Sequence, residues 1–125
     1  NWDTEYSDAL SIELPMAVVV NENTASAAEL FTSALKDYKK AIIVGNVTYG
    51  KGTMQSVIPL DDGSAVSIST KMYYPPYSDN YEGVGVQPDV AVDMSDELKN
   101  VNIYKITDEQ DTQLQAAINA LEDAQ

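Results

Sequence analysis

One serine and one lysine stand in settings that could support acyl transfer without histidine. The chain of 125 residues contains neither histidine nor cysteine, so a serine nucleophile needs a lysine or a carboxylate as its general base. Ser26 lies where an apolar, β-branched run gives way to a helical pattern, a setting that exposes a nucleophile and directs backbone amides at an oxyanion. Lys51 lies between Gly50 and Gly52. Close backbone approach there would bury its amine and favour the neutral form that a base requires.

Both residues also have ordinary interpretations. Ser26 and Glu29 form the Ser-x-x-Glu pattern of a capping box, and most such serines only cap a helix. Lys51 could be a solvated turn lysine, whereas a phosphate-binding loop fits poorly because Gly52, not serine or threonine, follows it. The other lysines lack a special setting: Lys36, Lys39, Lys40, Lys71, Lys99 and Lys105. Local sequence therefore favours capping over catalysis at Ser26, and a routine strand position for Gln55.

The charge and composition exclude several classes of function. Twenty acidic residues face seven basic ones, for a formal charge of −13, which disfavours nucleic acids and anionic membranes. The acidic residues are scattered and lack the order of a calcium-binding loop. No run approaches the roughly 18 apolar residues of a spanning helix. The start at Asn1 suggests a processed chain or an excised piece of a longer one.

The first half of the chain has the pattern of an α/β fold. The run 14–20 predicts a strand covered on both faces, and 41–45 predicts another. Between them, residues 26–38 predict a helix with one apolar face. That face comprises Ala27, Leu30, Phe31, Ala34, Leu35 and Tyr38. Strand, helix and strand in about 30 residues indicate a βαβ unit.

The second half predicts a hairpin and a tail helix. Segments 54–60 and 65–74 are expected to be strands joined by Asp61-Asp62-Gly63, followed by a mobile polar loop at 77–83 and a short strand at 89–94. Residues 108–124 predict an amphipathic helix capped by Thr107 or Asp108. Its apolar positions are Leu114, Ala117, Ile118 and Leu121. Residues 1–13 are expected to be a lead-in that packs through Trp2 and Leu10.

Several motifs together resemble the carboxy-terminal processing, or tail-specific, serine peptidases. They are NENTASAAE (21–29), ALKDY (34–38), VGNVTYGKGTMQ (44–55), LDDGSAVSISTKMYYPP (60–76) and GVGVQPDV (83–90). Lys51 follows Ser26 by 25 residues and Gln55 follows it by 29, the intervals of the family's catalytic site. The resemblance covers about residues 14–94.

The resemblance implies a role for each matching residue. Ser26 would attack the scissile carbonyl, Lys51 would take its proton, and Gln55 would hold the lysine amine. Ala27 would donate an oxyanion amide. Thr48 and Asp37 would be supporting residues; the acidic Asp37 near the carboxyl end of a helix is electrostatically unfavourable and hints at a specific partner. No metal or other cofactor is expected.

The resemblance also implies a larger protein. The family fold resembles the Clp-peptidase and crotonase spiral of βαβ units, usually with a PDZ domain that captures a substrate's carboxyl terminus. We expect 14–94 to be the carboxy-terminal part of the catalytic domain and 95–125 an extension. The upstream glycine-pair strand that supplies another oxyanion donor is missing, so the fragment alone is expected to be inactive. Export in bacteria, to the periplasm, cell envelope or exterior, is implied by the family.

Two departures from the family pattern and two other classes of function stand beside this interpretation. Ala28 replaces a frequent serine, and YSDNYEG (77–83) replaces a segment that usually contains glycine and arginine, which leaves substrate contacts open.

A non-catalytic binding module is the first alternative, because retinoid-binding modules of the interphotoreceptor matrix resemble this fold. A scaffold whose tail helix packs on a second copy, forming a homo-oligomer, is the other.

Overall fold

The computed structural model describes residues 4, 6 and 13–124. The expected packing of Trp2 and Leu10 lies outside these residues. In chain order the elements are β1 (Ala17–Val20), α1 (Ala27–Asp37), β2 (Ile42–Gly45), β3 (Thr53–Pro59), β4 (Ala65–Met72), β5 (Val90–Ala91), the 3₁₀ helix η1 (Ile103–Lys105) and α2 (Thr112–Asp123).

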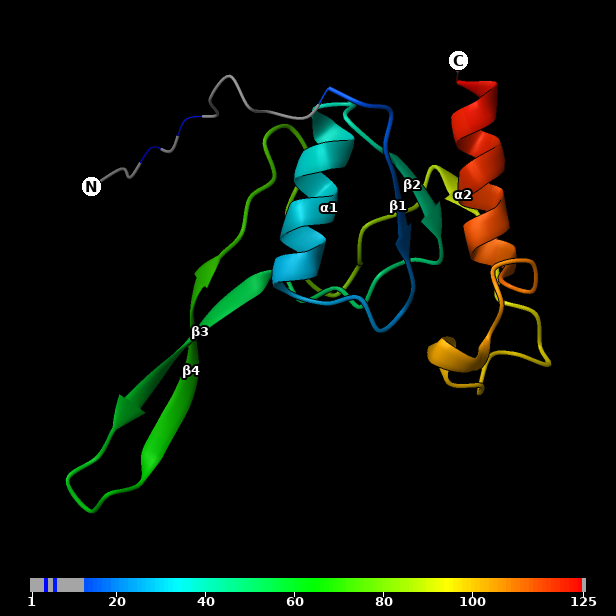
Figure 1. Cartoon of the computed structure of the whole chain (residues 1–125). Coiled ribbons are helices and arrows are strands. Elements are labelled where there is room, and N and C mark those ends of the chain that lie inside the picture. Colours follow the sequence, from blue (N-terminus) through cyan, green and yellow to red (C-terminus); the bar gives the residue numbers. More distant parts are fainter. Residues whose placement is uncertain (1–3, 5, 7–12, 125) are drawn as a thin grey trace.

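A three-stranded parallel sheet forms the centre of the molecule. The strand order is β1-β2-β5, with Ala17 opposite Ile42 and Val44 opposite Val90. α1 lies on one side of β1 and β2, and α2 lies on the other (Figure 1). Val20, Ile43 and Val44 are buried between these layers, as expected of β-branched strands covered on both faces. The predicted α/β class and its βαβ unit are confirmed.

The β3–β4 hairpin stands apart from this body. The two strands pair antiparallel and extend away from the sheet and helices (Figure 1). The predicted turn is present, with Gly63 at φ 86° and its amide donating to the carbonyl of Leu60 over 3.1 Å. Every residue of β4 is exposed. A two-stranded hairpin is only marginally stable on its own.

Several of the predicted strands are longer than the strands in the structure. The first strand begins at Ala17 rather than residue 14, because Leu14 is 70% exposed and Pro15 has no amide hydrogen for the ladder. The last strand is limited to Val90–Ala91, and β4 ends at Met72. Each apolar run predicts a strand along its whole length, but the run continues beyond the residues that pair with a neighbouring strand.

The tail helix begins later than predicted and packs on its own sheet. Asp111 is the cap, and its carboxylate accepts from the amides of Gln113 (3.0 Å) and Leu114 (2.9 Å). Thr107 and Asp108 instead begin a turn that precedes the helix. Ala117 and Gln113 are buried where α2 contacts β1 and β2. The face of α2 that carries Gln113 and Ala117 is therefore packed against the sheet of the same chain.

The buried side of α1 is polar, contrary to the predicted apolar face. Glu29, Thr32 and Ser33 are its buried residues, whereas Phe31 is 62% and Tyr38 is 57% exposed. Helical periodicity located an apolar stripe correctly, but periodicity alone cannot show which stripe faces the rest of the chain. The polar side faces the loops that follow β2, and these loops carry the predicted base.

Candidate active site

A tight turn between β1 and α1 presents Ser26. The Asn21 amide donates to the Thr24 hydroxyl (3.1 Å) and the Thr24 amide to the Asn21 carbonyl (2.9 Å). This turn is hydrogen-bonded to the loop 46–52 between β2 and β3, the Lys51 loop, because the Tyr49 amide donates to the Thr24 carbonyl over 2.9 Å. The two chain segments that bear the predicted nucleophile and base therefore follow adjacent parallel strands and leave the same edge of the sheet.

Ser26 has a backbone conformation unlike that of an ordinary helix cap. Its φ is 58° and its ψ is −118°, whereas a capping residue normally lies in the β region. A side chain at such a positive φ costs of order 1–3 kcal/mol and persists only where the surroundings hold it. The reciprocal contacts of the predicted capping box with Glu29 are present, but the serine hydroxyl makes no full capping hydrogen bond. The strained strand-to-helix turn is the geometry that exposes a nucleophile.

Glu29 holds that strained turn and the Lys51 loop together. Its side chain is fully buried. One carboxylate oxygen, Oε2, accepts from the backbone amides of Ser26 and Lys51, each over 2.8 Å. The other, Oε1, accepts from the Gly50 amide (2.6 Å) and the Thr48 hydroxyl (2.5 Å). Four donors satisfy a carboxylate whose burial would otherwise be costly.

Thr48, predicted as a supporting residue, extends this network. It is buried, and its hydroxyl donates to Glu29 while accepting from the Val86 amide over 2.7 Å. The hydroxyl thus fixes the orientation of the glutamate from the side opposite Ser26. The structure brings Thr48 into contact with the backbone network of the site and not with the side chains of Ser26 or Lys51.

The structure places Gln55 beside Lys51. Lys51 is partly buried, and its Nζ lies 3.5 Å from Gln55 Oε1, at the outer limit of a hydrogen bond. The strand register shifts between Met54 and Gln55, where Thr70 of β4 is left without a partner in β3. Gln55 is thus the hairpin residue whose side chain contacts the loop before the hairpin.

The glycines beside Lys51 allow another loop to approach closely. A Cβ on Gly50, which has φ 88°, would lie 3.0 Å from the Gly85 amide nitrogen. A Cβ on Gly52 would lie 2.8 Å from the amide of the Asn80 side chain and from the Glu82 backbone nitrogen. The close backbone approach predicted from the glycines is confirmed. The Ala27 amide is the first of α1 and has no acceptor within the helix.

Asp37 does not join this cluster. It lies at the other end of α1, roughly 15 Å along the helix axis from Ser26. Its carboxylate accepts from the Tyr77 and Ser78 amides, over 2.8 and 2.9 Å, and from the Ser78 hydroxyl. Desolvation acts to raise the pKa of Asp37, but these hydrogen bonds outweigh it and leave the pKa lowered. The specific partner that its position suggested is this loop.

The loop 77–83 is therefore anchored rather than mobile as predicted. Beyond Asp37, the Asn80 side chain donates to the carbonyls of Gly52 and Tyr73. Tyr81 is 5% exposed, and its hydroxyl has no hydrogen-bond partner among the described residues. Burial, with the nearby charge of Glu29, raises the pKa of Tyr81 to about 12. The polar composition that suggested mobility supplies the groups that anchor the loop.

Sequence reasoning assigned Glu29 only a capping role and passed over Asn80 and Glu82. The sequence marks Glu29 only through the Ser-x-x-Glu pattern, and its contacts with Thr48 and Gly50 appear only in the structure. Nothing local distinguishes it from an exposed capping glutamate. The difference lies in tertiary burial, which depends on a loop 19 to 22 residues further along the chain.

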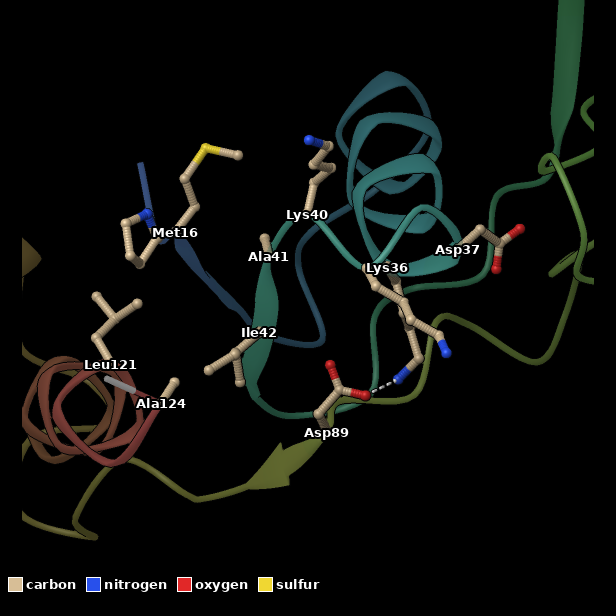
Figure 2. A pocket seen from close by; sticks show the side chains of 11 residues that line it. Met16, Lys36, Asp37, Lys40, Ala41, Ile42, Asp89, Leu121 and Ala124 are labelled. Atoms are coloured by element: carbon tan, nitrogen blue, oxygen red, sulfur yellow. Dashed lines mark hydrogen bonds and ion pairs between the residues drawn. The ribbon is translucent and has the colours of Figure 1, made fainter. Parts of the chain in front are cut away.

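A cavity of about 600 Å³ lies at the opposite, amino-terminal end of the sheet strands. Figure 2 shows Met16, Ile42 and Leu121 facing this space, with Lys36 turned toward Asp89. Lys36 is paired with Asp89 at 2.6 Å, and Lys40 is paired with Glu13 at 2.8 Å. Neither Ser26, Lys51 nor Gln55 lines this cavity.

Among residues 13–124, no group of three histidine, cysteine, aspartate or glutamate side chains is arranged to hold a metal ion. No helix of this part of the chain is long and apolar enough to cross a membrane.

Comparison with known proteins identifies the family. Residues 2–92 match the model of peptidase family S41, and the chain belongs to that family of serine peptidases. Carboxyl-terminal-processing peptidase 2 of Arabidopsis thaliana, a chloroplastic protein, is 46% identical over 88 residues, which are 70% of this chain and 17% of that protein. The carboxy-terminal-processing protease of Bartonella bacilliformis is 37% identical over 92 residues, 74% of this chain and 21% of that protein.

A solved structure agrees with these relatives. The photosystem II D1 C-terminal processing protease superposes with a TM-score of 0.60 and 44% identity, over 63% of this chain and 20% of that one. The chain thus spans about a fifth of the length of the relatives it matches. Its relatives include bacterial and chloroplastic processing proteases.

Proposed function

We propose that this chain supplies the nucleophile and general base of a carboxy-terminal processing serine endopeptidase. Ser26 Oγ attacks the scissile carbonyl while Lys51 Nζ takes the hydroxyl proton, and Gln55 holds the amine. The Ala27 amide donates to the oxyanion. Lys51 then returns the proton to the leaving amine, and water cleaves the acyl-serine ester with the same base. The reaction needs no cofactor.

The observation that carries this proposal is the strained turn at Ser26, held by an oxygen that also binds the Lys51 amide. Because both amides lie 2.8 Å from the same atom, the two backbones are close neighbours. A serine that served only as a cap would not need the cost of φ 58°. Thr48 supports the arrangement through Glu29. Asp37 supports it at a distance, through the loop that it anchors.

The proposal also includes a larger catalytic unit. Phe31 on α1, Tyr38 at its carboxyl-terminal cap and Val57 on the hairpin are large apolar residues that remain exposed. Such surfaces fit a fold in which 14–94 completes a Clp-peptidase-like or crotonase-like spiral with an upstream portion. That portion would add the second oxyanion donor and a PDZ domain. Residues 1–13 then serve as a connection and 95–125 as an extension.

We propose unstructured carboxyl-terminal tails of proteins as substrates, and an exported setting in bacteria. The 125 residues alone are inactive in this proposal, because one oxyanion donor is supplied elsewhere. The exposed apolar surfaces are the docking area for the rest of the peptidase.

Labelling with a serine-acylating or serine-phosphonylating probe tests this function. A longer protein that contains the upstream portion should be modified at Ser26 and should cleave unstructured tails. Lys51→Ala should slow both reactions by at least ~100-fold, whereas Lys71→Ala, which removes an exposed lysine of the hairpin, is the matched control. The rate should rise with pH, because only the neutral amine accepts a proton. Undiminished cleavage by the Lys51→Ala protein would exclude this mechanism.

A further inference from the structure

Side chains of the loop 77–83 bind both backbone groups of Gly52. The Gly52 amide donates to Glu82 Oε2 over 2.5 Å, and its carbonyl accepts from Asn80 Nδ2 over 2.9 Å. The two side chains are linked to each other, because the Glu82 amide donates to Asn80 Oδ1 over 2.8 Å. The loop 77–83 therefore holds both the peptide unit before Gly52 and the one after it.

These contacts complete a row of occupied amides around Lys51. The amides of Gly50 and Lys51 bind Glu29, and the next amide, Gly52, binds Glu82. Three successive amides that converge on carboxylates resemble an anion-binding nest filled by the protein's own side chains. The two carboxylates come from different elements, one from α1 and one from the loop 77–83.

The side chain of Lys51 depends on this backbone arrangement for its direction. Within the described residues, its amine has one hydrogen bond, the 3.5 Å contact with Gln55. A contact of that length holds a flexible lysine only weakly. The position of the Lys51 Cα, set by the bound amides on either side, must therefore do most of the orienting.

We propose that Asn80 and Glu82 are positioning residues for Lys51. They act through Gly52, fix the carboxyl side of Lys51 as Glu29 fixes its amino side, and so keep the amine directed at Gln55. The meaning of this for catalysis rests on the proposed function; the clamp itself does not.

The same loop is anchored at its other end by Asp37. α1 thus reaches the Lys51 loop by two routes, directly through Glu29 and indirectly through Asp37 and the loop 77–83. This second route explains how a residue at the far end of the helix can influence the lysine without contacting it.

The test measures the clamp and the lysine separately in the 125-residue chain. Amide hydrogen exchange followed by NMR reports the Gly52 hydrogen bond. Acetylation of each lysine at a fixed pH, read by mass spectrometry, reports how accessible the Lys51 amine is, with exposed Lys71 as the internal reference. Continued protection of the Ile43 and Val44 amides shows that each variant remains folded.

Glu82→Ala should speed exchange at Gly52 at least about tenfold, the effect of losing one hydrogen bond to a charged acceptor. It should also raise the acetylation rate of Lys51 toward that of Lys71, because Lys51 is partly buried and Lys71 is exposed. Asn80→Ala should produce the same two changes, and Glu82→Gln should restore most of the wild-type behaviour because its carbonyl still accepts. Asp79→Ala, an equal loss of charge in the same loop, should change neither.

Wild-type exchange at Gly52 in both alanine variants would overturn the clamp. Faster exchange at Gly52 with an unchanged Lys51 acetylation rate would overturn the positioning role. Neither measurement uses peptidase activity, so failure of probe labelling at Ser26 would count against the proposed function alone. If the longer protein cleaves, Glu82→Ala should lower kcat and leave KM near its original value, since the clamp does not contact substrate.

Discussion

The Lys51 loop and the β3–β4 hairpin follow each other directly along the chain but lie in opposite environments. Residues of the loop are enclosed by α1 and by the loop 77–83, and every amide from Gly50 to Gly52 has a carboxylate partner. The hairpin that begins at Thr53 has strands, a turn and apolar side chains, yet most of it faces solvent. Regular secondary structure is therefore no measure of how firmly a segment is held. The same substitution should have very different effects in the two regions.

The largest difference is expected for an isoleucine replaced by alanine. Ile43 on β2 is 0% exposed, whereas Ile58 on the hairpin is 45% exposed. Ile43→Ala should lower the free energy of unfolding by about 4 kcal/mol because it leaves a cavity, and Ile58→Ala by less than about 1 kcal/mol. Urea denaturation measures both. Similar losses for the two variants would mean that the hairpin is packed in solution.

A carboxylate replaced by its amide should give the next largest difference. In Glu29→Gln, either orientation of the new amide places an NH₂ group against at least one backbone N–H, since each carboxylate oxygen accepts from a backbone amide. We expect a loss of about 3 kcal/mol. Asp62→Asn in the exposed hairpin turn should change stability by less than about 0.5 kcal/mol. Equal denaturation midpoints would contradict the buried network.

Two glycines with nearly the same positive φ distinguish the effect of packing from the effect of backbone conformation. Gly50 has φ 88° and Gly63 has φ 86°, so alanine costs each about 1 kcal/mol from φ alone. A Cβ at Gly50 would meet three backbone nitrogens at 3.0–3.2 Å, and one at Gly63 would meet nothing within 4 Å. Gly50→Ala should therefore cost about 2 kcal/mol more. A matching loss at Gly63 would refute the close approach of the two loops.

The smallest effect is expected at Tyr81 and depends on pH. The pKa of Tyr81 is raised to about 12 by burial, whereas an unfolded tyrosine titrates near pH 10. Between these values the unfolded chain loses the proton first, so the folded state loses stability as pH rises, by about 1 kcal/mol per unit. Tyr81→Phe should remove that contribution and be neutral or slightly stabilising below pH 9, because it deletes a buried hydroxyl without a partner. Tyr74→Phe, the same change on an exposed ring, is the control for urea titrations at each pH.

Short-range patterns predicted the elements well and the environments poorly. The β-branched runs before Val20 and Gly45, and the Asp-Gly turn at Gly63, are local signals, and the corresponding strands and hairpin formed. The polar buried side of α1 could not be predicted, because Glu29 is satisfied by amides that arrive from Gly50 and Lys51. The prediction of a mobile loop at 77–83 was wrong for the same reason: Asp37 and Gly52, which anchor this loop, are distant in sequence.

The candidate site shows the same division. Ser26, Lys51 and Gln55 could be selected from residue type, glycine context and spacing, and the structure places Gln55 next to Lys51. Their roles in catalysis stay a prediction. The residues that hold them, Glu29 and Glu82, carry no local mark, because any exposed glutamate has the same sequence signature.

The shared oxygen of Glu29 has a consequence for the way this part of the molecule opens. Since one atom accepts from both the Ser26 and the Lys51 amides, a fluctuation that moves the Glu29 carboxylate removes the support of both amides at once. The two segments should therefore open as one cooperative unit, with a single exchange rate for both amides. Partial melting would dismantle nucleophile and base together, and a molecule with one in place and the other released would be rare.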